Sequence, residues 1–369
     1  MDTLSIPWEE LVEIYAQEQL PPPALLTWPL SDEAEARRVQ RAQLFDQSAE
    51  KGHPSGLEWM DTHAAAKYHP PAVLPDCHTI LVSALGLYRD DSACFTSLDE
   101  EYTPSGTIAC YARGRDYHKE LGGRIRRIVR RIQQNYPETQ CRGFSDIGPL
   151  DEVWLAQEAG LGFRGRHGLA ILPEWGTWVA LAHVLWTGHI LDSERIQKPA
   201  NLQQCPPKCQ RCIEACPTSA LHLQHGLEPS KCLSYLTIER PGPCPEEWDA
   251  AWGNRLFGCD SCQEACPFNA SISQTKVEGF LKDIAGAKLS LQEILKWKSH
   301  ADVVHRLAGS PLMRAGRSGL VRNACVLAAN SGDQRFIPLL KSLLDDEDEG
   351  VRVHAGRSLA RLEAQGTQG

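Results

Sequence analysis

The chain has 369 residues, which at about 150 residues per domain is enough for two or three domains, each with its own core. Hydrophobic residues make up 42% and charged residues 23%, a globular composition that excludes a disordered, collagen-like or coiled-coil chain. The formal charge of -9 argues against a protein that binds nucleic acid through its overall charge. Any contact with nucleic acid must therefore depend on local basic patches.

The N-terminal residues lack the basic and apolar blocks of a secretion signal, since Asp2, Glu9 and Glu10 fall among them. The most apolar stretch, residues 175–191, is interrupted by glycine and histidine, and is too short and too polar for a membrane span. We therefore expect a cytoplasmic protein without membrane contact. Its cysteines should be reduced.

The first part of the chain, residues 1–200, mixes helical patterns with short apolar runs, which predicts an α+β domain. The runs at 79–85 and 178–182 are typical of buried strands. Residues 117–133 carry apolar side chains at helical spacing with five arginines between them, from Arg124 to Arg131, and predict an amphipathic helix with a basic face. Such a face is either merely solvated, which we favour, or contacts phosphates.

The last part, residues 285–369, is rich in leucine and alanine at helical spacing and predicts a helical tail. Two stretches that begin at Val321 and Val351 repeat an Arg/Ala/Leu pattern about thirty residues apart, and they resemble HEAT-type helical pairs. Between them lies the acidic run 345–349. We expect this run to be a solvated turn that also caps the helix starting near Val351.

Nine of the fourteen cysteines fall between Cys205 and Cys266, and two runs there share the pattern Cys-x2-Cys-x3-Cys-Pro. In ferredoxin-like runs, three closely spaced thiolates bind one cluster and the cysteine before proline binds the other. We therefore expect a ferredoxin-like domain over residues 201–275 with two iron-sulfur clusters. The eight expected ligands are Cys205, Cys209, Cys212, Cys216, Cys232, Cys259, Cys262 and Cys266.

Other interpretations of these cysteines are weaker. Structural zinc also uses Cys-x2-Cys pairs, but it does not call for Cys-Pro after a gap of three, and no histidine falls at zinc-finger spacing. Disulfides are disfavoured in a reducing compartment. Cys205 is separated from Cys209 by three residues where two are common, and Cys244 has no partner at ligand spacing and is left out. Two clusters pass electrons singly, which predicts a reductive reaction elsewhere in the chain.

Six segments, in order along most of the chain, resemble the epoxyqueuosine reductases. The segments are Tyr-Ala-Arg-Gly-Arg-Asp-Tyr-His-Lys at 111–119, Asp-Ile-Gly-Pro-Leu at 146–150, Ala-Gly-Leu-Gly-Phe at 159–163, Cys-Leu-Ser-Tyr-Leu-Thr-Ile-Glu at 232–239, Gly-Asn-Arg-Leu-Phe-Gly-Cys-Asp-Ser-Cys at 253–262 and Gly-Ser-Pro-Leu at 309–312. The resemblance implies a cobalamin-dependent enzyme with two 4Fe-4S clusters. It would remove the epoxide oxygen from epoxyqueuosine at the tRNA wobble position. The resemblance also implies a cobalamin-binding domain related to that of reductive dehalogenases.

On this resemblance, Asp146 matches the proposed proton donor. An aspartate delivers a proton only if it is protonated beforehand, so we expect burial to raise its pKa. The alternative is structural, because Asp-x-Gly-Pro is also a common turn in which the aspartate caps a backbone amide. The chain departs from the family where Gly165-Arg-His-Gly replaces the usual Gly-Lys-Asn, and where Lys67 replaces an arginine of the cobalamin pocket. The cofactor contacts expected from the resemblance are Lys67, Cys110, Asp146, Arg166, His167, Ser234, Tyr235 and Thr237.

The leading interpretation is a monomeric reductase that acts on a tRNA anticodon loop carrying epoxyqueuosine and receives electrons from an external donor. A second is a cobalamin and iron-sulfur reductase for a small molecule, like reductive dehalogenases. A third is an electron-transfer protein or scaffold without an active site. Under the leading interpretation, the basic face of the helix contacts phosphates after all, so that the tail and the basic helix bind RNA, and truncation after about Gly309 leaves the clusters and bound cobalamin in place.

Overall fold

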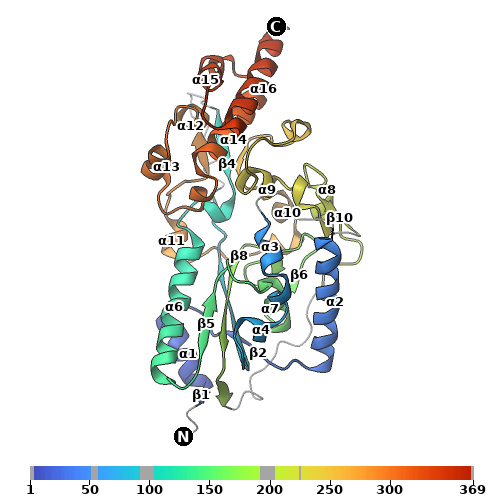
Figure 1. The fold of residues 1–369 in the computed structure, drawn as a ribbon, viewed down its shortest axis with the longest axis vertical. Helices are drawn as coiled ribbons and strands as arrows, with labels where there is room; N and C mark the ends of the chain where they lie inside the picture. The colour runs from blue at the N-terminus through green and yellow to red at the C-terminus, as the bar shows by residue number, and fades with distance from the viewer. Residues whose placement is uncertain (1–3, 51–56, 92–103, 192–203, 224–225, 367–369) are drawn as a thin grey trace.

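The computed structural model describes residues 4–50, 57–91, 104–191, 204–223 and 226–366. Figure 1 shows an elongated molecule with the N-terminal sheet at one end, the helical tail at the other, and the cysteine-rich segment between them on one side. In the described ranges, no helix is both long and apolar enough to cross a membrane. The boundary expected at residue 200 lies outside the described residues.

The N-terminal part is built on a four-stranded antiparallel sheet in the order β2-β3-β8-β5. The long central strands β3 (Thr79–Gly86) and β8 (Val179–Trp186) are flanked by β2 (Ala24–Thr27) and β5 (Cys141–Phe144). The central strands are buried on both faces, which explains their nearly continuous apolar sequence. The two strands expected from the sequence are confirmed, and β8 extends further than expected.

Helices cover both faces of this sheet (Figure 1). On one face, α1 (Trp8–Gln17) and α6 (Tyr117–Asn135) share a core with Leu81 and Val184. The other face is covered by α4 (Pro70–Val73), α7 (Glu152–Glu158) and α2 (Asp32–Ala49), which pack with Ile80 and Leu185. Neighbouring residues of one strand thus enter opposite cores, as the pleat of a strand requires.

The amphipathic helix expected at 117–133 is confirmed as α6, but its basic face is smaller than expected. Arg124 is buried and donates hydrogen bonds to the carbonyl oxygens of Glu18 and Gln19 at 3.1 and 2.9 Å. Arg127 pairs with the Glu18 carboxylate at 2.6 Å. These two arginines therefore hold the end of α1, while Arg126, Arg130 and Arg131 are exposed.

A second, three-stranded sheet joins all three expected domains. Its central strand β4 (Ser105–Ile108) pairs in parallel with β12 (Arg255–Phe257) and antiparallel with β13 (Lys288–Ser290). Because β4 and β12 run in parallel, the residues that follow them lie together. The backbone N–H of Cys110 accordingly donates to the Oδ2 atom of Asp260 at 2.7 Å.

The tail is helical, as expected. Its helices are α12 (Leu291–Ile294), α13 (His300–Leu307), α14 (Gly316–Ser331), α15 (Ile337–Ser342) and α16 (Glu349–Gly366). The two similar stretches lie on α14 and α16, which pack against each other (Figure 1). The backbone N–H of Val351 donates to Oδ1 of Asp348 at 3.1 Å, so the acidic run does cap this helix.

The tail and the cysteine-rich segment share one hydrophobic core, which also includes Ile108 of β4. Leu320 and Val321 of α14 belong to it together with Leu236 of α9 (Leu233–Ile238) and Phe257 of β12. Truncation after Gly309 would remove α14 and expose this core. This shared core argues against the expectation that the tail can be removed without disturbing the clusters, and it joins residues from all three of the expected ranges 1–200, 201–275 and 285–369.

Besides short 3-10 helices, the described residues form further short strands and α-helices. They are β1 (Ser5–Pro7), α3 (Trp59–Thr62), β6 (Phe163–Arg164), β7 (Ala170–Ile171), β9 (His189–Leu191), α8 (Arg211–Glu214), β10 (Leu221–His222), β11 (Gly226–Leu227), α10 (Ser261–Glu264) and α11 (Glu278–Leu281).

Candidate functional site

The eight expected cluster ligands gather in two groups of four. Burial raises the pKa of Cys212, Cys232, Cys262 and Cys266, and repulsion by neighbouring thiolates raises it too. These neighbours, together with the four cysteines that line one cavity, indicate the groups, and Cys212 lies near enough to Cys262 to link them. The first cysteine group consists of Cys205, Cys209, Cys212 and Cys266. The second cysteine group consists of Cys216, Cys232, Cys259 and Cys262. Cys216 and Cys266, which precede prolines, thus each lie with the cysteines of the opposite run.

This donor set fits iron-sulfur clusters. Thiolates packed this closely repel one another, and bound iron would neutralise their charge. Backbone N–H groups also point at the sulfurs: Ala220 donates to the Cys216 Sγ atom at 3.2 Å, and Ser234 and Tyr235 donate to that of Cys232. Within the described part of the chain, no three or more His, Cys, Asp or Glu side chains are grouped as ligands of a single metal ion.

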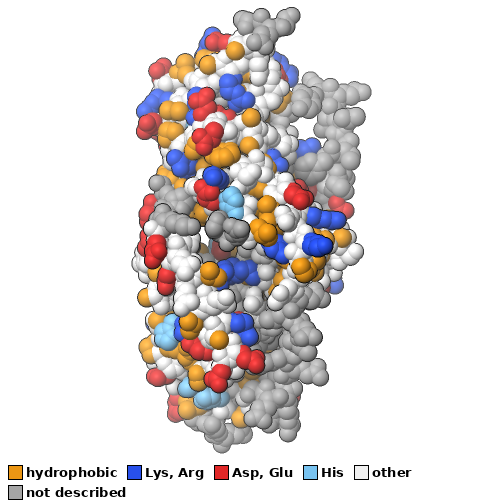
Figure 2. Space-filling model, turned by 90° about the vertical axis from the view of Figure 1, so that its right-hand side faces the viewer, with side chains coloured by type: hydrophobic (Ala, Val, Ile, Leu, Met, Phe, Trp, Pro, Cys, Tyr) orange, Lys and Arg blue, Asp and Glu red, His pale blue; other side chains and the backbone are white. Residues whose placement is uncertain are grey.

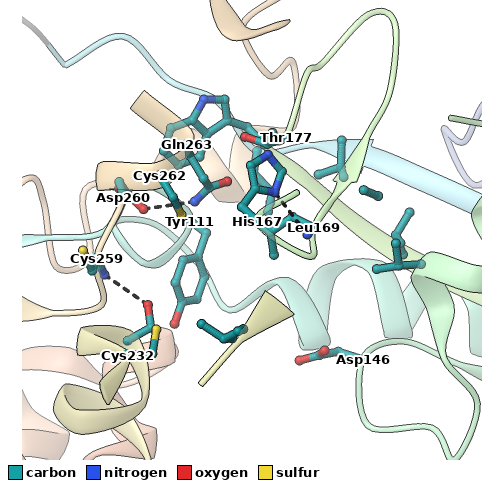
Figure 3. A pocket seen from close by; sticks show the side chains of 18 of the residues that line it. Tyr111, Asp146, His167, Leu169, Thr177, Cys232, Cys259, Asp260, Cys262 and Gln263 are labelled. Carbon is teal, nitrogen blue, oxygen red and sulfur yellow. Dashed lines mark hydrogen bonds between the residues drawn. The ribbon is translucent and has the colours of Figure 1, made fainter. Parts of the chain in front are cut away.

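A cavity of about 540 Å³, here called the cluster-side cavity, lies between the four-stranded sheet and the second cysteine group. All four cysteines of that group line it. In Figure 3, Cys232, Cys259 and Cys262 lie on one side of this cavity and Asp146 on the other. Most of the remaining wall is apolar and includes Leu87, Leu150, Trp178, Val179, Leu181, Leu221, Leu227 and Leu233.

Four of the eight expected cofactor contacts line this cavity: Lys67, Asp146, His167 and Ser234. Burial lowers the pKa of Lys67, and burial also lowers the pKa of His167 to about 4, so that this imidazole is neutral at pH 7. The Nδ1 atom of His167 accepts a hydrogen bond from the backbone N–H of Leu169 at 3.2 Å, which leaves the proton of the neutral ring on Nε2.

The other four expected contacts are not among the described residues that line the cavity. The Cys110 thiol lies 3.9 Å from the carbonyl oxygens of Leu87 and Arg89. Arg166 donates to the carbonyl oxygen of Pro207 at 2.9 Å and so ties the β6–β7 hairpin to the start of the cysteine-rich segment. Tyr235 is buried in the core shared with the tail. The Thr237 hydroxyl accepts from the Gly258 N–H at 2.9 Å and holds α9 against β12. These four residues support the framework.

Asp146 lies in the loop between β5 and α7 and has a left-handed backbone, with φ of 63°. Its Oδ2 atom accepts hydrogen bonds from the Tyr117 hydroxyl and from Nε2 of His118, the latter at 2.8 Å. The Asp146 side chain is 52% exposed. Partial loss of hydration pushes the pKa of Asp146 upward, but the hydrogen bonds from His118 and Tyr117 outweigh this effect, and the pKa lies below its ordinary value. The expected rise is therefore not found, and side chains rather than a backbone amide are the partners of this carboxylate.

Two buried groups lie behind Asp146. The backbone N–H of Asp146 donates to Oε1 of Glu152 at 2.9 Å, and the same oxygen lies 3.3 Å from Nδ1 of His183 in β8. Burial raises the pKa of Glu152. This arrangement anchors the Asp146 loop to the central strand of the sheet.

A second cavity of about 740 Å³, here called the tail-side cavity, adjoins the first. Tyr111, Tyr117 and Asp146 line both cavities. The rest of its wall comes from the start of α6, the Asp146 loop, the end of α9, β12, the start of the tail and the residue after α3. It consists of His63, Asp116, His118, Lys119, Ile147, Ile238, Glu239, Phe257, Ser310, Pro311, Met313 and Arg314. Asp146 therefore lies at the junction of a largely apolar chamber beside the cysteines and a chamber of mixed polarity beside the tail.

The sequence interpretation missed Asp116, Tyr117 and His118, although all three fall inside the segment 111–119. A signal was present, because Asp116 is a good N-cap immediately before the predicted helix and is followed by two side chains able to exchange protons. Only the fold shows that this helix start meets the loop of Asp146.

Two family comparisons match separate parts of the chain. The 4Fe-4S double cluster binding domain matches residues 204–269, and the domain of unknown function found in epoxyqueuosine reductases matches residues 67–147. The first match covers the eight cysteines described above, so the chain is an iron-sulfur redox protein with two 4Fe-4S clusters.

The particular family follows from whole-chain comparisons. The chain is 33% identical over 310 residues, 83% of this chain and 84% of the relative, to the epoxyqueuosine reductase of Xanthomonas campestris. It is 31% identical over 294 residues, 79% of this chain and 75% of the relative, to that of Escherichia coli. The chain therefore belongs to the epoxyqueuosine reductase family.

A solved structure shares the fold. An epoxyqueuosine reductase bound to a tRNA-Tyr stem loop modified with epoxyqueuosine superposes with a TM-score of 0.80 at 22% identity, over 96% of this chain and 89% of that chain. This likeness supports the mixed helix and strand architecture described above.

Proposed function

We propose that this chain reduces epoxyqueuosine in tRNA to queuosine, with cobalamin in the cluster-side cavity and the modified nucleotide in the tail-side cavity. The observation that carries the proposal is the position of Asp146, which lines both cavities. A nucleotide that enters through the tail-side cavity reaches the Asp146 carboxylate first. From there, the second cysteine group lies on the opposite side of the cluster-side cavity. The family relationship supports the same reaction.

The cluster-side cavity fits cobalamin in its chemistry. Its wall is mostly apolar, as the flat faces of a corrin require, and Lys67, His167 and Ser234 supply polar contacts at its edge. When bound there, cobalamin would supply the strongly reducing centre that epoxide opening needs. The chain itself would hold this group against the cysteines Cys216, Cys232, Cys259 and Cys262, so that electrons need cross only a short gap.

The reaction breaks two carbon-oxygen bonds of the epoxide, forms a carbon-carbon double bond, and releases the oxygen as water. It consumes two electrons and two protons. The clusters pass the electrons singly from an external donor. The residues of this chain orient the nucleotide, exclude bulk water with Tyr111 and Tyr117, and supply a proton at Asp146.

The tail, whose helices resemble HEAT-type pairs, is proposed to contact the anticodon loop. It contributes Pro311, Met313 and Arg314 to the wall of the tail-side cavity, next to Lys119 of α6. Basic and acidic side chains are interspersed on the face shown in Figure 2, so RNA binding would depend on local groups rather than on a uniform basic surface. We propose a monomer that acts in the cytoplasm, where its tRNA substrate is.

Product analysis tests this proposal. Anaerobic protein with both clusters reconstituted and cobalamin added is reduced and given tRNA that carries epoxyqueuosine. Nucleoside mass spectrometry should then show loss of one oxygen and formation of queuosine. The alternative, a small-molecule reductase, predicts turnover of the free nucleoside or a simple epoxide but not of the tRNA.

A further inference from the structure

The proposed reaction consumes protons at Asp146, yet this carboxyl group is poorly suited to store one. Its pKa is lowered, because hydrogen bonds from His118 and Tyr117 outweigh the effect of the partial loss of hydration. At neutral pH the side chain is therefore a carboxylate, which accepts rather than donates. Another group must hold the proton until the epoxide oxygen leaves.

His118 meets that requirement by its geometry. Its Nδ1 atom lies 2.8 Å from Oδ1 of Asp116, and its Nε2 atom lies 2.8 Å from Oδ2 of Asp146. If both carboxylates are ionised, each ring nitrogen must carry a proton. If instead the ring is neutral, one of its nitrogens lacks a proton, and the carboxyl group that faces that nitrogen, Asp116 or Asp146, must hold one, because two facing acceptors cannot bond without a proton. In both cases one mobile proton lies on the line between His118 and Asp146.

The start of α6 fixes this imidazole. Asp116 is the N-cap of the helix, and its Oδ1 atom accepts from the backbone N–H of His118 at 3.0 Å as well as from the ring. The ring of Tyr117 stacks on that of His118 with centroids 4.1 Å apart, and the Tyr117 hydroxyl donates to the same Asp146 oxygen. The ring therefore has little freedom to turn away from Asp146.

We propose that His118, oriented by Asp116, stores the proton that Asp146 passes to the oxygen leaving the substrate epoxide. This inference rests on the proposed function. In the step, a proton moves from Nε2 of His118 to the Asp146 carboxylate, and the carboxyl group so formed passes a proton to the departing oxygen; once the imidazole is protonated again, the same transfer supplies the second proton of the water that is released. The electrons come from the external donor through the clusters. The neutral imidazole then regains a proton from water through the tail-side cavity, which it lines.

The surrounding charges agree with this role. Burial by itself would lower the pKa of His118. The hydrogen bonds to Asp116 and Asp146 have the larger effect and raise this pKa above its ordinary value, to about 9. The imidazole is therefore protonated at neutral pH and loses its proton only as the pH rises through about 9. The ionisable groups that face the pair from the neighbouring elements are Asp116, Tyr117 and Lys119 of α6, Tyr111, Glu152 of α7, His63, Glu239 after α9, and Arg314 of the tail.

The pH dependence of single turnover tests the proposal, with Asp116→Asn, His118→Gln and, as a matched control on the exposed side of β9, His189→Gln. The parent rate should fall above about pH 9, the pKa of His118. Loss of the Asp116 carboxylate lowers that pKa, so Asp116→Asn should lose activity at lower pH while it stays active in mild acid. His118→Gln should lose about a hundredfold or more in rate at every pH, as expected for a positioned proton donor. His189→Gln should match the parent.

A direct titration separates this proposal from the proposed function. In protein labelled with ¹³C at histidine, the resonance missing from His118→Gln should titrate near pH 9 in the parent and at lower pH in Asp116→Asn. A His118 resonance that titrates near 6.5, or a pH profile unchanged in Asp116→Asn, overturns the proton store. Failure of the parent to reduce epoxyqueuosine tRNA, with the high titration intact, instead overturns the proposed function.

Discussion

Asn323 of α14 donates a hydrogen bond to the carbonyl oxygen of Thr237 in α9 at 2.8 Å, and the same amide nitrogen also donates to the Leu256 carbonyl at 2.9 Å. Asn323 is fully buried. The neighbouring Arg322 donates to the Leu236 carbonyl at 2.7 Å. The tail therefore fixes α9, which follows Cys232, and β12, which precedes Cys259. Both of these cysteines line the cluster-side cavity.

Asn323→Ala should weaken the second cysteine group. It leaves two buried carbonyl groups without this donor, at a cost of about 1–3 kcal/mol for each. We expect a lower midpoint of thermal unfolding and partial loss of the cluster bound by the group of Cys232, seen as reduced iron content and a weaker electron paramagnetic resonance signal.

Asn330→Ala is the matched control for that variant. Asn330 lies on the same helix and also donates to two carbonyl groups, those of Asp249 and Gly253 at 2.8 and 3.0 Å, but these do not belong to α9 or β12. It should lower stability without a selective loss of one cluster. Equal iron content in both variants and the parent would show that α14 does not position the cysteines.

Substitution of the cysteine before proline tests whether each run supplies this cysteine to the cluster of the opposite run, an arrangement called the exchange below. Cys216 belongs in sequence with Cys209 and Cys212, but it lies with Cys232 in space. Cys216→Ser should therefore remove the cluster beside the cavity first, while Cys209→Ser should first remove the other. Redox titration of the two clusters in each variant distinguishes the sites.

Cys244→Ser is the control for these cysteine variants, because its sulfur lies 3.7 Å from the carbonyl oxygen of Leu236 and away from both groups. A serine can make the same contact, so both clusters should remain. Loss of the same cluster in Cys216→Ser and Cys209→Ser would contradict the exchange.

How much could be predicted from sequence depended on whether the signal was local. The cysteine runs and the strand at 79–85 were predictable, because covalent spacing and a continuous apolar run carry the information. The cofactor contacts were harder: Ser234 lines the cavity while Tyr235, the next residue, enters the core shared with the tail. The pairing of His118 with Asp146 depends on a turn with positive φ and on a contact between distant segments, which no local pattern shows.

Asp146→Asn should lower turnover by about a hundredfold or more, because an amide cannot pass a proton. Binding of cobalamin and both clusters should survive, since the change is isosteric and the loop stays anchored through its backbone to Glu152. Single-turnover rates and the visible spectrum of the loaded protein measure both effects. The control is Asp345→Asn, which removes a carboxylate from the exposed turn before α16. A parent-like rate in Asp146→Asn would exclude the role of this residue in proton transfer.

The last prediction concerns RNA and an exposed row on α6, which consists of Lys119, Arg126 and Arg130. Residues at this spacing share one face of a helix, and Lys119 lines the tail-side cavity, so the row leads away from the cavity along the outside of the molecule. An anticodon loop with its modified nucleotide in the cavity would lay its backbone along this row. Arg126→Gln and Arg130→Gln should each weaken tRNA binding and reduce the salt dependence of affinity by about one ion for each phosphate that the arginine neutralises in the parent.

The other arginines of α6 serve as internal controls for this row. Arg127→Gln should have a smaller effect on the salt dependence, because Glu18 already neutralises its charge at 2.6 Å. Arg124→Gln should lower stability instead, since it removes donors from the backbone of Glu18 and Gln19 at the end of α1. Affinities measured between low and moderate salt for all four variants decide the matter. If Arg126→Gln, Arg127→Gln and Arg130→Gln all keep the parent slope, RNA does not follow α6, and binding must depend on the tail alone.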